Sequence, residues 1–94
     1  MFQVALSEPV LRALYDRLNG LAGTVDVVKV CKDLGTGNDL YTACVELHMH
    51  GLLEFDTESL QTEIHERKKV IVGIRGHLTE SGLEKGRALC GEAQ

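Results

Sequence analysis

Residues 25–53 have the sequence VDVVKVCKDLGTGNDLYTACVELHMHGLL, a pattern that predicts two short helices joined by a turn. Asp26 can cap the first of these helices, and Gly35 can end it. Thr36 or Asn38 can cap the second, because both side chains can accept hydrogen bonds from the N–H groups of a first turn. The inward face of the first helix is expected to hold apolar residues at helical spacing, namely Val27, Val30, Cys31 and Leu34.

The second helix of this pair has its own apolar positions at steps of three and four residues, which are Leu40, Cys44 and Leu47. Gly51 follows this helix, and a glycine in that place favours a left-handed helix end. We therefore expect the chain to leave the helix as a strand over residues 52–55.

An amphipathic helix is expected upstream, with Ser7 as its cap and an apolar stripe made of Leu11, Leu14, Leu18 and Leu21. Gly20 and Gly23 are expected to end this helix. Before it comes an alternating apolar pattern that suits either a short strand or an arm lying on a neighbouring chain, formed by Phe2, Val4 and Leu6.

The extended apolar run after residue 59 is best explained by a β-hairpin. A three-residue loop at 66–68 would place facing pairs on a single face, namely Ile64 with Val70, Thr62 with Val72 and Leu60 with Ile74. A two-residue loop would distribute these residues over both faces, and a rival helix over residues 58–68 would have only a thin apolar stripe. Thr79 is expected to cap a last helix, which Gly82 and Gly86 weaken by about 1 kcal/mol each relative to Ala.

This order of helix, turn, helix, hairpin and closing helix resembles the winged-helix regulators of the MarR, ArsR and PadR type. The resemblance is carried by Gly51-Leu52-Leu53 at a helix exit and by Leu78-Thr79-Glu80-Ser81-Gly82 at the entry to the last helix. It implies an α+β fold with a three-helix core, a β-hairpin wing and a C-terminal helix. It also implies a dimeric transcriptional regulator, so we expect residues 1–94 to form a single winged-helix domain that pairs as a homodimer.

The charge pattern departs from this resemblance. The formal net charge is −4, from 10 basic and 14 acidic residues, whereas proteins that hold polyanions usually have a basic balance. Members of such families usually expose Arg, Ser or Gln on the third helix. Here the outward positions are expected to be Asn38, Asp39, Tyr41, Thr42, Val45, Glu46 and Met49.

Two functions remain open from the sequence. If the protein binds double-stranded DNA, the candidate phosphate contacts are the cations of the wing, Arg67, Lys68, Lys69 and Arg75. Contacts to bases, or to phosphate at the helix N-terminus, are expected from Thr36, Asn38, Tyr41 and Thr42. The alternative is a winged-helix module that binds another protein through one helical stripe, made of Tyr41, Val45 and Met49.

The sequence lacks the motifs that are typical of metal-binding proteins, enzymes and membrane proteins. Cys44 and His48 are four residues apart, but no CxxC or HxxxH pair accompanies them, so we expect no metal and no cofactor. We expect no enzyme either, because no nucleophile elbow, paired catalytic carboxylates or phosphate-loop ending is found. Three cysteines without framework spacing, no signal peptide and no long apolar run predict a cytoplasmic protein with reduced thiols and no membrane contact.

Overall fold

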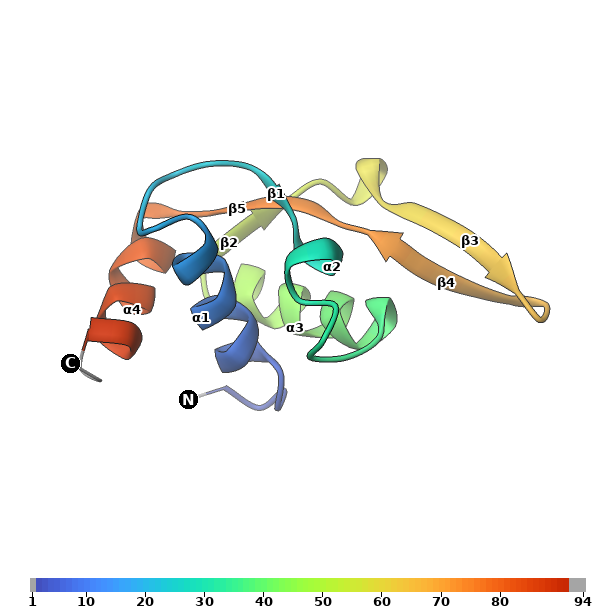
Figure 1. Ribbon diagram of the computed structural model, residues 1–94, viewed down its shortest axis with the longest axis horizontal. Helices are drawn as coiled ribbons and strands as arrows, with labels where there is room; N and C mark the ends of the chain where they lie inside the picture. Colours follow the sequence, from blue (N-terminus) through green and yellow to red (C-terminus); the bar gives the residue numbers. More distant parts are fainter. Residues whose placement is uncertain (1, 92–94) are drawn as a thin grey trace.

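The computed structural model describes residues 2–91, and these form a mixed α+β fold with four α-helices and a small antiparallel sheet (Figure 1). The elements follow one another as α1 (Ser7–Arg17), β1 (Val25–Asp26), α2 (Val27–Val30), α3 (Gly37–Met49), β2 (Leu53–Phe55), the 3-10 turn η1 (Thr57–Ser59), β3 (Gln61–His65), β4 (Lys68–Gly73), β5 (Arg75–Leu78) and α4 (Glu80–Gly91). The expected α+β class is confirmed.

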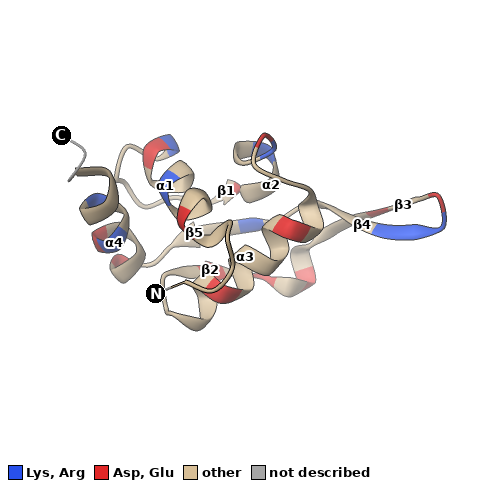
Figure 2. Ribbon diagram, turned by 90° about the horizontal axis from the view of Figure 1, so that it is seen from below, with Lys and Arg blue, Asp and Glu red and all other residues tan. Residues whose placement is uncertain are grey.

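Strand β5 is the centre of a three-stranded antiparallel sheet, with β1 on one side and β2 on the other. Strands β3 and β4 pair with each other as a separate hairpin, which extends far from the helices in both views (Figures 1 and 2). Because this hairpin projects from the helices, the molecule is elongated, with principal extents of 45 × 22 × 21 Å. We call residues 61–73 the hairpin and the rest of the described chain the body.

The core lies where α1, α2 and α3 meet β2 and the residues around β5. The predicted inward residues of α3 are all confirmed as fully buried, and α1 contributes Leu11 and Leu14 as expected. The complete set of buried apolar residues is Val10, Leu11, Leu14, Val27, Cys31, Leu40, Ala43, Cys44, Leu47, Leu52, Leu53, Ile74 and Leu78.

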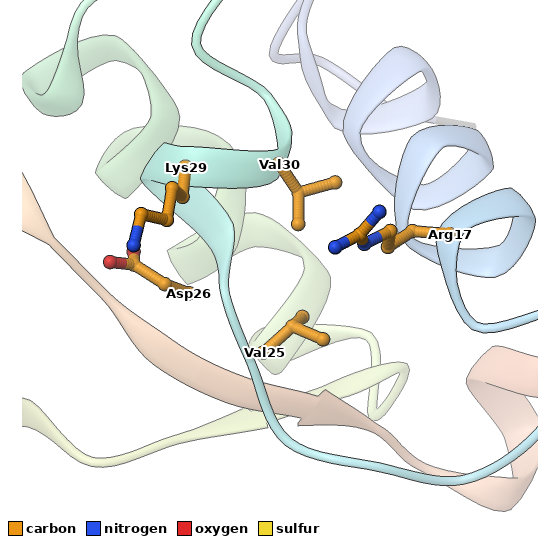
Figure 3. A pocket seen from close by; sticks show the side chains of 5 residues that line it. All are labelled: Arg17, Val25, Asp26, Lys29 and Val30. Carbon is orange, nitrogen blue, oxygen red and sulfur yellow. The ribbon is translucent and has the colours of Figure 1, made fainter.

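The start of α2 confirms Asp26 as its cap and gives this carboxylate a second task. Its Oδ1 accepts a hydrogen bond from Val28 N at 3.1 Å and another from Ile74 N, also at 3.1 Å. Val27 N in turn donates to Ile74 O at 2.7 Å. Asp26 therefore joins the start of α2 to the point where β4 passes into β5, beside a surface hollow of about 340 Å³ that Arg17 of α1 overhangs (Figure 3).

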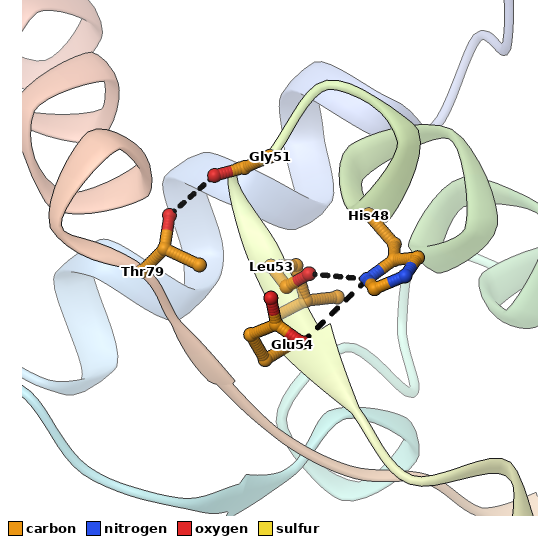
Figure 4. Close-up of polar contacts among 5 residues, drawn as sticks. All are labelled: His48, Gly51, Leu53, Glu54 and Thr79. Carbon is orange, nitrogen blue, oxygen red and sulfur yellow. Dashed lines mark hydrogen bonds and ion pairs between the residues drawn. The ribbon is translucent and has the colours of Figure 1, made fainter.

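The predicted residues cap the start of α3 and the start of α4, and the predicted glycine ends α3. Thr36 accepts a hydrogen bond from Asp39 N at 3.2 Å, and Gly51 has a φ of +72°, the left-handed region expected for it. Thr79 Oγ1 accepts from Gly82 N at 3.0 Å and donates to Gly51 O at 2.5 Å, so one hydroxyl joins the two helix ends (Figure 4). The caps and the glycine end are confirmed.

His48 makes a polar contact at the same exit from α3 (Figure 4). Its Nδ1 donates to Leu53 O at 3.0 Å and lies 3.9 Å from a carboxylate oxygen of Glu54. Both side chains of this ion pair are about half exposed, at 50% and 54%, so its contribution to stability is small.

Several expectations for the first third of the chain are wrong. Ser7 is the first residue of α1 and does not cap it, because its hydroxyl donates across the fold to Glu46. Leu21 is 68% exposed, since α1 ends at Arg17 before the stripe reaches it. Helix α2 ends at Val30, which leaves Leu34 at 38% exposure outside the core.

Residues 2–6 do not form a strand, and they lie against the chain's own body. Its apolar residues Phe2, Val4 and Leu6 pack partly buried against the chain's own core, and Phe2 stacks edge-on against His50 with ring centroids 5.3 Å apart.

The hairpin is confirmed, and the rival helix is excluded because residues 61–65 form a strand. Its register, however, differs from the prediction. His65 pairs with Lys68 across a two-residue loop, and Glu66 and Arg67 have φ angles of +52° and +68°, as a twisted type I′ turn requires. The predicted register assumed one buried face, but every residue of β3 is exposed, so burial does not select the loop length.

The glycines of α4 have a role that helix propensity does not reveal. A Cβ at Gly82 would lie 1.9 Å from Leu52 O, and one at Gly86 would lie 2.8 Å from the Tyr15 ring. Both glycines are buried, so they let α4 lie against the exit of α3 and against α1. The loss of helix propensity is therefore offset by close packing.

Candidate functional site

The first half of α3 and the side of the hairpin that faces it border a shallow surface hollow of about 450 Å³. The α3 side is formed by three of the predicted contact residues, Asn38, Tyr41 and Thr42. The other side is formed by Leu60, just before the hairpin, and by Thr62, Lys69 and Ile71 of the hairpin. The structure thus brings one predicted phosphate contact, Lys69, to the same hollow as the predicted base contacts.

A tight joint between α3 and β4 forms one side of this hollow. Asn38 Oδ1 accepts a hydrogen bond from Ile71 N at 3.0 Å. A Cβ at the preceding residue, Gly37, would lie only 1.6 Å from Ile71 O, so no other residue type fits without moving the strand. Thr36, the fourth predicted residue at this helix end, is occupied in capping Asp39 N.

The cations of the hairpin divide between its two faces. Cross-strand partners share a face, so Lys69 lies with Ile64, Thr62 and Ile71 on the face toward α3. Lys68 lies with His65 on the opposite face, and Arg67 occupies the loop. Figure 2 shows the basic part of β4 next to acidic positions at the loop and on β3.

Carboxylates accompany these cations. Glu63 lies on the same face as Lys68, and its Oε1 is 2.8 Å from His65 Nε2. Glu66 is the first loop residue. The end of the hairpin is therefore a mixed-charge surface, with the basic residues of β4 next to the carboxylates of the loop and of β3.

Arg75 does not belong with the other predicted wing cations. It begins β5, pairs with Asp26 in the three-stranded sheet, and borders another hollow of about 340 Å³. Glu54 and Asp56 border the same hollow. Grouping Arg75 with the hairpin was therefore wrong, because the strand breaks at Ile74 and β5 joins the body.

The predicted stripe for protein contact is divided by the fold. Tyr41 is half-buried and stacks edge-on against Phe55, with ring centroids 5.9 Å apart. Val45 and Met49 instead border a hollow of about 400 Å³ beside the N-terminal segment, together with Val4. Met49 is 80% exposed, so this second hollow has an accessible apolar rim.

Glu46 has a structural role that the sequence did not reveal. Its carboxylate accepts hydrogen bonds from Gln3 N at 2.8 Å, Val4 N at 2.9 Å and Ser7 Oγ at 2.6 Å. The Ser7 hydrogen bond, followed by the two backbone bonds and nearby His50, lowers the pKa of this carboxyl below its usual value. Glu46 therefore holds the N-terminal segment on α3 and is not the free surface carboxylate that the helical pattern suggested.

Cys44 and His48, four residues apart on α3, each have another place in the fold. Cys44 is fully buried, and burial, together with neighbouring Cys31, raises its thiol pKa to about 12. His48 uses Nδ1 to bind Leu53 O. Within residues 2–91 no three His, Cys, Asp or Glu side chains are grouped so that they could hold a metal ion.

No family model, curated protein or solved structure matches this chain. In the part of the chain that the structure describes, every helix is too short or too polar to cross a membrane.

Proposed function

We propose that the protein is a winged-helix transcriptional regulator that binds double-stranded DNA. Helix α3 is the groove-facing helix, and the hairpin is the wing. The order of elements supports this assignment, because α1, α2 and α3 are followed by β2, the hairpin and α4 in the sequence of a winged-helix domain. The three-stranded sheet then closes the body by pairing β5 with both β1 and β2.

A single observation carries the proposal: Lys69 of the hairpin borders the same hollow as Asn38, Tyr41 and Thr42 of α3. A cation within reach of a phosphate thereby lies beside polar side chains at a helix N-terminus, where backbone N–H groups also favour an anion. Arg67 and Lys68 extend the cationic surface along the hairpin. Phosphate contacts of this kind position a protein on a duplex without reading its sequence.

The negative net charge limits the strength of such binding but does not exclude it. Glu46, one of the two carboxylates of α3, is occupied by three hydrogen bonds from the N-terminal segment. Asp39 is exposed in the first turn of α3 and weakens the attraction for phosphate there. We therefore expect modest affinity that depends on the hairpin cations, in a cytoplasmic protein that acts as a homodimer.

The test is fluorescence anisotropy with a pool of labelled duplexes of mixed sequence at two or more salt concentrations. Binding through Arg67, Lys68 and Lys69 predicts that the logarithm of affinity falls with the logarithm of salt with a slope of about −2 to −3, near −0.9 for each phosphate contact. The double variant Lys68→Glu/Lys69→Glu should lose binding at low salt.

The matched control is Arg12→Glu/Arg87→Glu, which changes the net charge equally on exposed positions of α1 and α4. These helices lie at the opposite end of the molecule from the hairpin (Figure 1). The control should keep most of the affinity, and sedimentation of the same samples reports the homodimer. Equal losses in both double variants would show only an unspecific charge effect and would refute the proposed interface.

The second candidate function is a winged-helix module that binds another protein. The observation in its favour is the apolar hollow bordered by Val45 and Met49, which lies on α3 away from the hairpin cations. Two results together would favour this function. The protein would not bind duplexes at low salt, and its regulatory effect in cells would survive Lys68→Glu/Lys69→Glu but be lost in Met49→Glu.

A further inference from the structure

Strand β4 and the residue that follows it are joined to the body at two points three residues apart, Ile71 and Ile74. At Ile74, the N–H donates to Asp26 Oδ1 at 3.1 Å and the carbonyl accepts from Val27 N at 2.7 Å. At Ile71, the N–H donates to Asn38 Oδ1 at 3.0 Å. The Ile74 contact alone would fix only the position of this end of the hairpin. The Ile71 contact, three residues further along, also fixes the direction in which the hairpin extends.

Beyond Ile71 most of the hairpin is exposed to solvent. All residues of β3 are exposed, and so are Lys68 and Lys69 of β4. At roughly 3.3 Å per residue, Lys68 lies about 10 Å beyond the Ile71 contact. A rotation of about 10° at Ile71 would therefore move Lys68 by about 2 Å, enough to break a charge-assisted hydrogen bond to a phosphate.

We infer that Asn38 is a positioning residue: its hydrogen bond to Ile71 N fixes the direction of the hairpin relative to α3 and so the spacing between the hairpin cations and the helix. This inference rests on the proposed DNA-binding function for its purpose, but the geometry it assigns to Asn38 is independent of DNA.

The chemistry of the asparagine side chain supports this role over base reading. Recognition of adenine by asparagine uses the amide oxygen and the amide nitrogen together. In this structure the oxygen of Asn38 already accepts the Ile71 N–H, at the edge of a strand that has no partner strand there. Using the oxygen for a base would compete with the Ile71 N–H, which lies at an exposed strand edge and would then have to bind water.

Gly37 supports the same joint from the backbone side. Because a Cβ there would lie 1.6 Å from Ile71 O, the helix start and the strand are in direct backbone contact. The sequence Gly37-Asn38 thus supplies the close approach and the hydrogen bond from neighbouring residues. Gly37 is a poor test position, however, since any side chain would displace the strand and could unfold the domain.

The test measures hairpin direction without DNA, by spin-label distances between Arg12→Cys on α1 and His65→Cys at the end of β3. Cys90→Ser removes the partly exposed native thiol, whereas Cys31 and Cys44 are buried with thiol pKa values raised to about 11 and about 12 and will not be labelled. Hydrogen exchange of the Ile71 amide is followed in the same variants without the labels.

Three substitutions are compared. Asn38→Ala removes the acceptor, so the distance distribution should shift or broaden by about 2 Å and the Ile71 amide should exchange at least about fivefold faster. Asn38→Asp keeps an acceptor oxygen in the same place and should preserve both readings. Asp39→Asn, the neighbouring exposed residue, should also leave both unchanged.

The inference is overturned if Asn38→Ala leaves the distances and the exchange rate as in the parent protein, or if Asn38→Asp behaves like Asn38→Ala. A shifted hairpin in Asn38→Ala combined with no duplex binding by the parent protein would refute the proposed function and keep the positioning role. A shifted hairpin with duplex affinity reduced in Asn38→Ala would support both.

Discussion

The body and the hairpin are held in shape by different forces. In the body, α3 buries Leu40, Ala43, Cys44 and Leu47 completely, and the ends of its helices are closed by side-chain and backbone hydrogen bonds. In the hairpin, β3 is exposed along its whole length and Ile64 is 70% exposed. Burial therefore determines the structure of the body, whereas the loop and the Ile71 joint determine that of the hairpin.

This difference shows where the protein can change at low cost. Substitutions that alter the hairpin surface remove little packing, so its charges can be adapted to a ligand without loss of the fold. Substitutions in the body remove contacts on several sides and change stability before they change function.

The largest effect on stability is expected when one buried side chain of the body is shortened to alanine, and the matching change in the hairpin should have almost none. Leu47→Ala should reduce the free energy of unfolding by about 3 kcal/mol, because it leaves a cavity in a fully buried site. Ile64→Ala should change it by less than about 0.5 kcal/mol. Urea unfolding followed by circular dichroism measures both, and a loss of similar size in the two variants would contradict the division between body and hairpin.

A smaller effect is expected from adding one methyl group to α4. In Gly82→Ala the new Cβ would meet Leu52 O at 1.9 Å, so unfolding free energy should fall by about 2 kcal/mol as α4 moves away from the α3 exit. Gly91→Ala, in the same helix with nothing within 4 Å, should cause no loss. Thermal unfolding of the pair measures the cost of close packing, and equal melting temperatures would show that α4 is not pressed against Leu52.

The smallest effect is a pH dependence within the body. The folded pKa of Glu46 lies below the ordinary value of 4.5, chiefly because Ser7 donates to the carboxylate. A lowered folded pKa stabilises the fold above the ordinary value, and this stabilisation disappears as the pH falls through the folded pKa. Wild type should therefore be more stable than Glu46→Gln at pH 7, and the difference should shrink as the pH falls below 4.5.

Urea unfolding of both proteins at pH 7 and pH 3 measures this difference, and Ser7→Ala serves as the control because it removes the main donor. In a Ser7→Ala background the effect of Glu46→Gln should be smaller. A difference that is the same at both pH values would mean that the carboxylate charge does not hold the N-terminal segment.

Most local features of the body were predictable from the sequence. The caps Asp26, Thr36 and Thr79 and the left-handed Gly51 involve partners only a few residues away, so the nearby sequence contains the information. The Glu46 contacts were not predictable, because Gln3, Val4 and Ser7 lie about 40 positions earlier in the chain. The hairpin register was missed for a related reason, since a burial pattern carries no information where no face is buried.

The candidate site shows the same limit. The sequence identified Asn38, Tyr41 and Thr42 on α3 and Lys69 on the hairpin, and the structure places all four around one hollow. It could not show that Arg75 joins the body sheet. Nor could it show that the oxygen of Asn38 is bound to Ile71 N, because that contact joins residues 33 positions apart.

The sequence by itself determined the helices of the body and the face that α3 buries, because helical periodicity and capping act over one or two turns. Only the tertiary structure decided which exposed residues of α3 face the hairpin, which carboxylate is bound by the N-terminal segment, and which cations stand together. Those pairings depend on the direction in which each element leaves the core. Backbone contacts such as Gly37 against Ile71 and Gly82 against Leu52 set that direction.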